Sequence, residues 1–179
     1  MNLIASARAR SVLTAPDKAN LRELCAERVA FDEPLAPYTS WKIGGPADAY
    51  VTVESELQLA SLMRFSLKRK LPWFVLGSGS NLLVGDGGIR GLILRLAGSF
   101  TSISVRASQD IAIEAGASAS MAALTSKAAS AGAVGIGSLA GIPGSVGGSL
   151  RMNAGTDREM GDFVRDIWVQ TPTKPEPHS

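Results

Sequence analysis

The stretch VLGSGSNLLVGDGG, residues 75–88, places two glycine-rich turns directly after a short apolar run. The apolar run, residues 73–76, is interpreted as a buried strand. Residues 82–84 then indicate an extended return of the chain before the second turn. A segment with so few side chains, directly after a strand, has two possible uses. It makes a tight strand–turn–strand connection, or it offers main-chain N–H groups to a ligand. Both interpretations are open at this point.

The first turn, Gly-Ser-Gly-Ser-Asn, has the composition of a phosphate-binding nest. Its consecutive N–H groups can surround phosphate oxygens, and its two serine hydroxyls add donors. Asn81 can bond phosphate or cap the turn. The spacing after Gly79 does not fit a Rossmann fingerprint, and no lysine follows as it would in a P-loop. The pattern therefore favours a diphosphate that is bound without a metal and is not cleaved.

A second glycine-rich region, GIPGSVGGSLRMNAG, covers residues 141–155. Backbone this bare over such a length suggests that another molecule lies on it. Two separated loops of this kind could hold two ends of one long ligand, such as a dinucleotide. Arg151 is the only cation in this region. It is a candidate contact for an anionic substrate or for the pyrophosphate, with a solvated arginine at a helix end as the alternative.

The composition makes several functional classes improbable. The net charge is +2 without a basic block, and only 6% of the residues are aromatic, so a nucleic-acid partner is not expected. One cysteine, Cys25, and one histidine, His178, provide no material for a disulfide, a metal site or a Ser-His-Asp triad. Cys25 is expected to lie on a helix and to fill the protein core, and Trp41 and Trp73 are expected to be core residues rather than residues that stack on a ligand.

No run of residues is long and apolar enough to cross a bilayer, and the first twenty residues lack the apolar centre of a signal peptide. We therefore expect a cytoplasmic protein without membrane insertion, and we favour a monomer.

The order of predicted elements is mixed and indicates an α+β fold with two lobes. Helices are expected over residues 17–30, 56–70 and 117–131, strands over 47–53, 91–97 and 163–170, a hairpin over 99–107 and 110–117, and turns over 34–46. The last strand is expected to have nothing after it to pair with, because it finishes in TPTKPEPHS, which is interpreted as a frayed end or a linker. The expected domains are an N-terminal extension and helix (1–30), a first lobe (31–98), a second lobe that may be incomplete (99–171) and a tail or linker (172–179).

Three motifs taken together resemble the UDP-N-acetylenolpyruvoylglucosamine reductase (MurB) family. They are YTSWKIGGPADAYV, VLGSGSNLLVGDGGIRGLILRL and LAGIPGSVGGSLRMNAG, in that order within residues 35–169. The family belongs to the flavoproteins with a vanillyl-alcohol-oxidase-type (PCMH-type) FAD domain. The resemblance implies a two-lobed α+β domain that binds FAD non-covalently, with the C-terminal substrate lobe of full-length members absent from these residues.

The resemblance also implies which residues would hold the cofactor. Residues 77–81 would surround the FAD pyrophosphate, residues 39–45 would border the cofactor, and residues 142–148 and 153–155 would follow the ribityl chain and the isoalloxazine ring. The implied cofactor-binding residues are Gly44, Gly45, Gly77, Ser78, Gly79, Ser80, Asn81, Gly141, Ile142, Pro143, Gly144, Ser145, Gly147, Gly148, Asn153, Ala154 and Gly155. Two departures are Lys42, where the family usually has arginine, and the missing tyrosine after residue 156.

The activity that the resemblance implies is the reduction of an enolpyruvyl UDP-sugar by NADPH through FAD, which forms UDP-N-acetylmuramate for peptidoglycan synthesis. The family's catalytic arginine, serine and glutamate occur in segments expected beyond Ser179, so no catalytic residue is assigned. Two alternatives belong to other classes. One is a catalytically incomplete flavin- or nucleotide-binding module, and the other is an interaction domain with glycine-rich turns.

Overall fold

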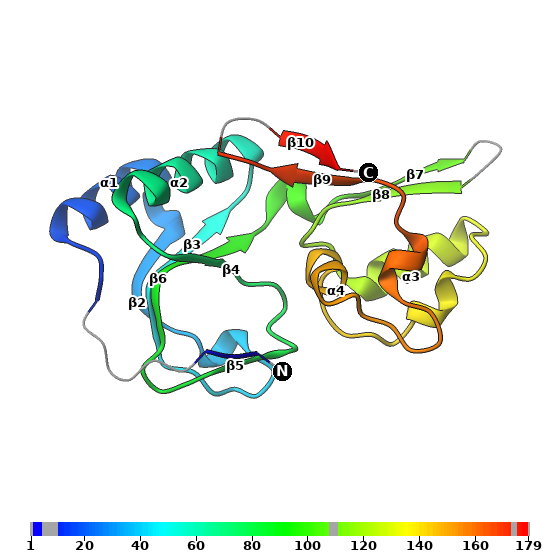
Figure 1. The fold of residues 1–179 in the computed structure, drawn as a ribbon, viewed down its shortest axis with the longest axis horizontal. Helices are drawn as coiled ribbons and strands as arrows, with labels where there is room; N and C mark the ends of the chain where they lie inside the picture. Colours follow the sequence, from blue (N-terminus) through cyan, green and yellow to red (C-terminus); the bar gives the residue numbers. More distant parts are fainter. Residues whose placement is uncertain (1, 5–10, 108–110, 173–174, 179) are drawn as a thin grey trace.

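A computed structural model describes residues 2–4, 11–107, 111–172 and 175–178 of the chain. Two lobes lie side by side, a sheet covered by two helices and a hairpin packed on short helices (Figure 1). Mixed helices and strands in this arrangement confirm the predicted α+β class.

The first lobe is built on a four-stranded sheet in the order β2-β3-β6-β4. Its strands are β2 (Val29–Pro34), β3 (Pro46–Val53), β6 (Ile89–Leu96) and β4 (Trp73–Val75). Strands β3 and β4 both run parallel to β6, whereas β2 is antiparallel to β3. Because parallel strands end at the same edge of a sheet, the loop that follows β4 begins beside the carboxyl ends of β3 and β6.

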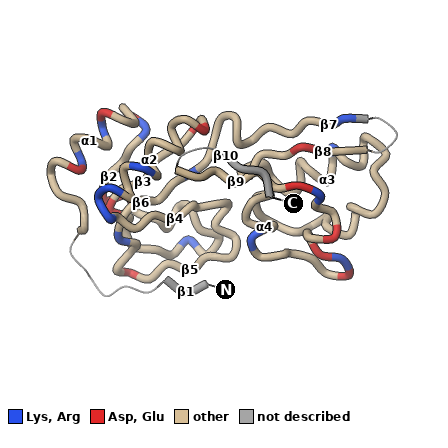
Figure 2. The backbone as a smooth tube through the Cα atoms, turned by 45° about the horizontal axis from the view of Figure 1, so that its top comes forward, with Lys and Arg blue, Asp and Glu red and all other residues tan. Residues whose placement is uncertain are grey.

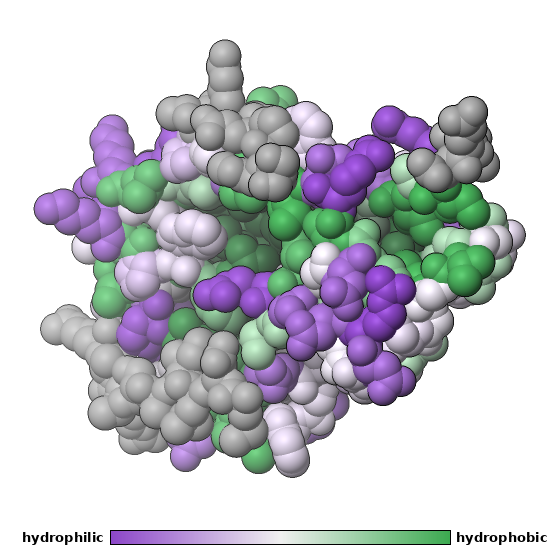
Figure 3. Space-filling view, turned by 45° about the vertical axis from the view of Figure 1, so that its right-hand side comes forward, coloured by the Kyte–Doolittle hydropathy of each residue, from purple (hydrophilic) through white to green (hydrophobic). Residues whose placement is uncertain are grey.

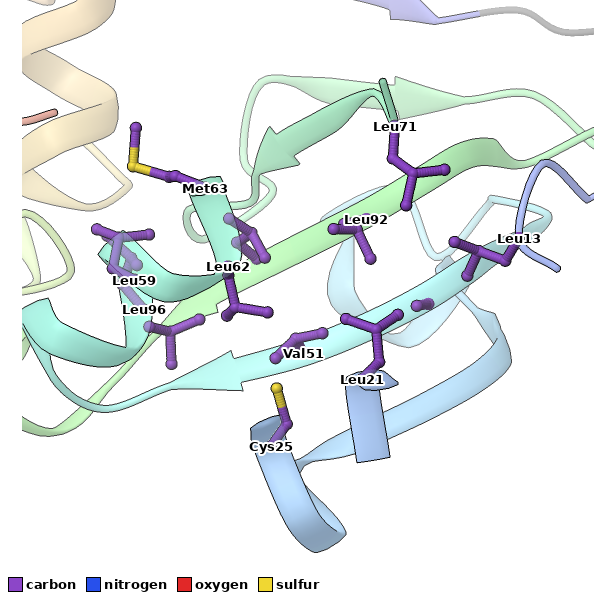
Figure 4. Packing of buried hydrophobic residues seen from close by; sticks show 13 residues of the cluster. Leu13, Leu21, Cys25, Val51, Leu59, Leu62, Met63, Leu71, Leu92 and Leu96 are labelled. Carbon is purple, nitrogen blue, oxygen red and sulfur yellow. The ribbon is translucent and has the colours of Figure 1, made fainter. Parts of the chain in front are cut away.

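Two helices cover one face of this sheet. Helix α1 (Ala15–Cys25) starts at the capping residue Thr14, and helix α2 (Glu56–Arg69) starts at Ser55, whose hydroxyl accepts from the Gln58 N–H. The apolar stripe of each helix packs on the sheet (Figure 4). The buried residues of this core are Leu13, Leu21, Cys25, Ala49, Val51, Val53, Leu59, Leu62, Met63, Leu71, Leu92, Leu94 and Leu96.

The opposite face of the sheet carries a second, smaller core. Its buried members include Tyr50 and Ile93 from the sheet and Leu76 from the loop after β4, and Tyr38 and Phe74 pack against them. Strand β5 (Leu82–Val84) closes this side and pairs in parallel with β1 (Asn2–Ile4). Short 3-10 helices at Ala26–Arg28 and Ala36–Tyr38 connect the elements.

A buried ion pair fastens β3 to the turn before β6. Asp48 is fully buried, and its carboxylate lies 2.5 Å from Nη1 of Arg90. The same carboxylate accepts from the backbone N–H groups of Val12 and Gly91. Arg90 in turn donates to the carbonyl of Gly87, so one charged pair fixes the second glycine-rich turn of the sequence.

The second lobe packs an antiparallel hairpin, β7 (Ile103–Ala107) and β8 (Ile111–Ala115), on helix α3 (Met121–Ser130). Helix α4 (Val146–Met152) and 3-10 helices at Gly98–Thr101, Ile136–Leu139 and Met160–Phe163 complete the lobe. Its core is separate from those of the first lobe and contains the buried residues Ala119, Met121, Leu124, Leu139, Val146 and Met160. The predicted link of the hairpin, residues 108–110, lies outside the described residues.

Strand β9 (Ile167–Gln170) follows the second lobe and returns toward helix α2 (Figure 1). Arg64 of α2 donates to the carbonyl of Pro172, at 2.8 Å. Strand β10 (Pro175–His178) pairs antiparallel with β9. The expectation that the strand at Ile167–Gln170 has nothing after it to pair with is therefore wrong, because the residues that follow supply its partner.

Four other expectations about elements need correction. Helix α1 ends at Cys25, and Val29 begins strand β2, which was missed because its apolar residues continued the helical spacing. Strand β4 is an edge strand whose Trp73 and Val75 are exposed, so it is not a buried strand. Helix α3 begins at Met121, since Ser120 caps it. Helix α4 was not predicted within its glycine-rich region.

The expectation that Trp41 and Trp73 are core residues is wrong. Trp41 is 59% exposed in the loop before β3, and Trp73 is 40% exposed on the edge strand. Cys25, in contrast, is buried in the first core, which confirms its predicted packing role.

Candidate functional site

The two glycine-rich regions of the sequence meet at the boundary between the lobes. A Cβ built on Gly77 would lie 2.7 Å from Oγ of Ser145, and one built on Gly144 would lie 3.3 Å from Oγ of Ser80. Figure 1 shows the same arrangement, with the loop after β4 facing α4. Residues 77–81, which we name the first loop, and residues 141–145, the second loop, therefore border one common site.

The conformation of the first loop requires glycine at position 79. Gly79 has a φ of +68°, and a Cβ there would lie 2.1 Å from the carbonyl oxygen of Tyr38. Its own carbonyl accepts from the Ser40 N–H at 3.1 Å. The loop thus packs backbone against backbone on the segment that precedes β3, and a left-handed turn without a side chain is the only conformation that fits.

The main-chain N–H groups of the first loop are left without protein acceptors. Among the described residues, no carbonyl or side-chain oxygen accepts from the N–H groups of residues 77–81. Gly79 itself is buried. Ser78 and Asn81 are exposed, so the N–H groups of this loop are accessible to an acceptor other than the protein.

The second loop and the first turn of α4 differ in what their N–H groups bond to. Val146 and Gly147 donate to the carbonyls of Ala119 and Ala117, and the Gly148 N–H donates to the Ser145 hydroxyl that caps α4. Within the described chain, the N–H groups of Gly144 and Ser145 have no acceptor. These two residues are the ones that contact the first loop, so their N–H groups extend the set of available donors.

One cation lies beneath the first loop. Arg95 is on β6, on the same face as Ile93, because side chains alternate along a strand. Its Nη1 donates to the carbonyl oxygen of Gly77. Among the described residues, no aspartate or glutamate pairs with Arg95. The sequence analysis missed this residue, although a single charge near the end of the apolar run GLILRL was a signal for it.

Two stacked tyrosines form the floor beside Arg95. The rings of Tyr38 and Tyr50 stack with centroids 4.4 Å apart. The Tyr38 hydroxyl donates to Glu33 at 2.8 Å, and this hydrogen bond, with burial, raises the pKa of Tyr38 to about 12. Burial raises the pKa of Tyr50, and the nearby charge of Arg95 partly opposes that shift. Both tyrosines are therefore neutral at physiological pH and cannot act as bases.

Other residues predicted to bind the cofactor are packed into turns of their own. A Cβ on Gly45 would lie 2.0 Å from the carbonyl oxygen of Asp86 in the second turn of the opening stretch, and one on Gly44 would lie 3.1 Å from Cβ of Val84. A Cβ on Gly155 would lie 2.2 Å from the carbonyl oxygen of Arg158. For the glycines at 44, 45 and 155, close packing within the protein explains the residue type without a ligand.

Asn153 ends α4 in the left-handed conformation, and its side-chain amide contacts Glu159 and the Gly161 N–H. Ala154 continues that turn by donating to the Ser149 carbonyl. Arg151 is exposed in the last turn of α4 and has no partner within the described part of the chain. Ile142 packs against the core of the second lobe, whereas Pro143 and Gly141 are exposed.

The surroundings of the site carry few charges. Figure 2 shows Lys, Arg, Asp and Glu gathered on α1, on α2 and after α4, with little charge along the backbone between the lobes. The face in Figure 3 is hollowed near its middle, with hydrophobic residues at the floor of the hollow. Over the described ranges, no three His, Cys, Asp or Glu residues converge as metal ligands. This chemistry suits a ligand with a diphosphate and a large apolar part.

Main-chain N–H groups without an acceptor among the described residues, beside a cation without a described carboxylate partner, suit a phosphate-containing ligand. Residues 47–172 match the family described as FAD binding domain, and the chain belongs to that family. In the described parts of the chain, no helix has the length and apolar character needed to span a bilayer.

Individual relatives narrow the similarity further than the family does. The chain is 41% identical over 155 residues to the UDP-N-acetylenolpyruvoylglucosamine reductase of Syntrophus aciditrophicus, with 85% of this chain and 49% of that protein covered. It is 46% identical over 125 residues to the reductase of the same name from Rubrobacter xylanophilus, covering 70% of this chain and 41% of that protein. The crystal structure of the MurB reductase from Thermus caldophilus matches with a TM-score of 0.69 and 34% identity, over 84% of this chain and 51% of that one.

These matches confirm the resemblance and the predicted two-lobed FAD-domain fold. The chain spans about half the length of the curated relatives it matches.

Proposed function

We propose that the chain is the FAD-binding part of a UDP-N-acetylenolpyruvoylglucosamine reductase, which uses NADPH to reduce an enolpyruvyl UDP-sugar for peptidoglycan synthesis. The observation that carries the proposal is the set of unpaired N–H groups on the first loop, directly beside the second loop. The similarity to reductases with this printed name supports the substrate and the reaction.

In this proposal the first loop holds the FAD diphosphate through its N–H groups and the hydroxyls of Ser78 and Ser80. Gly144 and Ser145 border the cofactor from the second lobe. When bound, the flavin ring supplies the hydride transfer between NADPH and the enolpyruvyl double bond. The protein orients the ring and limits the access of water; among the described residues, the two tyrosines of the floor are neutral and supply no base.

The alternative is a flavin-binding module that does not complete the reaction. None of the 179 residues forms the Tyr-Arg-x-Ser segment that the family resemblance associates with catalysis. The chain as given is therefore expected to bind FAD and to turn over slowly, if at all, without the residues that stabilise charge in the transition state.

The test is to add FAD to the purified chain, remove the excess and record the visible flavin spectrum. NADPH is then added with and without the enolpyruvyl UDP-sugar, and the bleaching and recovery of the flavin band are followed. Retained FAD with turnover that depends on the sugar supports the reductase. Retained FAD without such turnover supports the binding module, and a colourless protein that takes up no FAD contradicts both.

A further inference from the structure

The carbonyl of Gly77 is fixed by a residue of the sheet below the first loop. In a trans peptide, the C=O of one residue and the N–H of the next point in opposite directions. Because Arg95 holds the Gly77 carbonyl toward β6, the N–H of Ser78 must point away from the sheet. The orientation of the first donor of the loop is thus set by a side chain that is remote in sequence.

The backbone position of Arg95 is set by the centre of the first sheet. It lies on β6, a central strand of the first sheet, opposite Thr52 of β3. Its neighbours in sequence, Leu94 and Leu96, are buried in the core under helices α1 and α2. The core therefore fixes the backbone of Arg95, and the hydrogen bond from its guanidinium joins the first loop to this strand.

The charge of Arg95 also matters. A half-buried cation without a carboxylate partner leaves positive potential at the surface above it. The loop above Arg95 presents N–H groups, which attract anions as well. Both features favour a negatively charged ligand at the first loop. A purely structural arginine, in contrast, is usually neutralised by Asp or Glu, as Arg90 is by Asp48.

We propose that Arg95 is a positioning residue for the diphosphate of the dinucleotide: it fixes the peptide between Gly77 and Ser78 so that the Ser78 N–H faces the diphosphate, and it adds positive charge beneath the loop. This inference rests on the proposed function, since it assumes that FAD is the ligand. It extends that function by assigning affinity for the diphosphate to a side chain outside both glycine-rich loops.

The test compares Arg95→Met and Arg95→Lys by titration of FAD, with Arg106→Met as a control. Methionine keeps the apolar stem but removes the donor and the charge, whereas lysine keeps both and loses only the planar fork. Arg106 is an exposed arginine of β7, and its replacement changes the net charge equally. The dissociation constant is measured by quenching of flavin fluorescence, and thermal unfolding is measured without FAD.

A hydrogen bond from a charged donor is expected to change affinity by about tenfold to hundredfold. We expect Arg95→Met to weaken FAD binding by that amount, Arg95→Lys to stay within about threefold of the original chain, and the control to be unchanged. If the methionine and lysine variants lose affinity equally and in proportion to their loss of apo-protein thermal stability, Arg95 is only structural and the inference is overturned.

Equal FAD affinity of Arg95→Met and the original chain would also overturn the inference, while leaving the proposed function intact. If the original chain binds no FAD at all, the proposed function itself fails. Should Arg95→Met not fold, the comparison of Arg95→Lys with the original chain still decides, because a weakening beyond about tenfold in a folded lysine variant contradicts rescue by charge and donor.

Discussion

At the residue scale, the site depends on where the backbone comes closer to itself than any side chain allows. Gly79 combines a left-handed φ with a contact to the Tyr38 carbonyl, and neither can tolerate a Cβ. Gly137 is a useful contrast, since a Cβ there would have no heavy atom within 4 Å. Gly79 is thus a glycine that its surroundings require, whereas Gly137, in the 3-10 helix Ile136–Leu139, has room for a side chain.

We expect Gly79→Ala to abolish retention of FAD, with the dissociation constant raised at least about tenfold. Left-handed backbone costs alanine about 1–2 kcal/mol, and the added Cβ must displace the loop from Tyr38. Gly137→Ala is the matched control and is expected to change stability by less than about 0.5 kcal/mol. Fluorescence titration with FAD measures the effect, and unchanged binding by a folded Gly79→Ala variant would rule out the assigned loop geometry.

Sequence reasoning predicted the residue composition of the site better than its contacts. The sequence predicted a turn at residues 77–81, but it left open whether that turn holds a ligand or only connects two strands. The sequence could not show that Gly45 and Gly155 pack within the protein, because close packing and ligand contact both select glycine. Arg95 was missed because its partner is a backbone carbonyl eighteen residues away, which no local pattern encodes.

At the element scale, helix α1 shows how one charged side chain can stabilise a whole element. Asp17 and Thr14 form a capping box at its first turn, and Arg69 at the end of α2 lies 2.6 Å from the Asp17 carboxylate. Burial raises the pKa of Asp17, but hydrogen bonds from Arg69 and Thr14 outweigh it and hold the pKa below its ordinary value of 3.8. The two helices are thereby joined at one end.

This shift makes the stability of the first lobe dependent on pH. A carboxyl whose pKa is lower in the folded state stabilises the protein above its unfolded pKa, and the contribution is lost as pH falls through the folded pKa. We expect Asp17→Asn to lower the free energy of unfolding by about 1 kcal/mol at pH 7, and by less near pH 3. Urea unfolding at both pH values measures this.

The control for the pH experiment is Asp32→Asn, because Asp32 is an exposed partner of Lys18 on the same side of the lobe. Its replacement is expected to have little effect at either pH. If Asp17→Asn lowers the free energy of unfolding by the same amount at pH 7 and at pH 3, the charge of Asp17 does not contribute to stability.

Elements were predicted correctly where the apolar residues followed one period, either helical or strand-like. They were predicted wrongly where the same residues fitted both periods. Helix α2 followed its pattern closely because it has one buried face, and strand β3 matched its predicted extent although both of its faces are buried. The boundary between α1 and β2 was misplaced because Val29 fits both a helical stripe and a strand. Helix α4 was hidden by its glycines; the contacts of Gly147 with Ala117 explain why a small residue stands there despite its low helix propensity.

At the scale of the whole molecule, the site joins two lobes that have separate cores. A ligand that binds both loops adds its binding energy only when both lobes are folded and correctly placed. FAD should therefore stabilise the molecule as a unit. At a concentration a hundred times its dissociation constant, it should add about 2.7 kcal/mol to the free energy of unfolding.

We expect FAD to raise the midpoint of thermal unfolding, and riboflavin, which lacks the diphosphate, to raise it much less at equal concentration. Differential scanning calorimetry gives both values on the same preparation. If the two compounds raise the midpoint equally, the binding energy comes from the riboflavin part of FAD alone. That result would contradict a diphosphate site on the first loop.

The most direct measurement is hydrogen exchange of the individual amides with and without saturating FAD. The donors identified here are the N–H groups of residues 77–81 and of Gly144 and Ser145. If they hold the diphosphate, their exchange should slow by at least about tenfold, beyond any general protection of the fold. If FAD binds while these amides exchange at unchanged rates, the ligand lies elsewhere and the account is wrong.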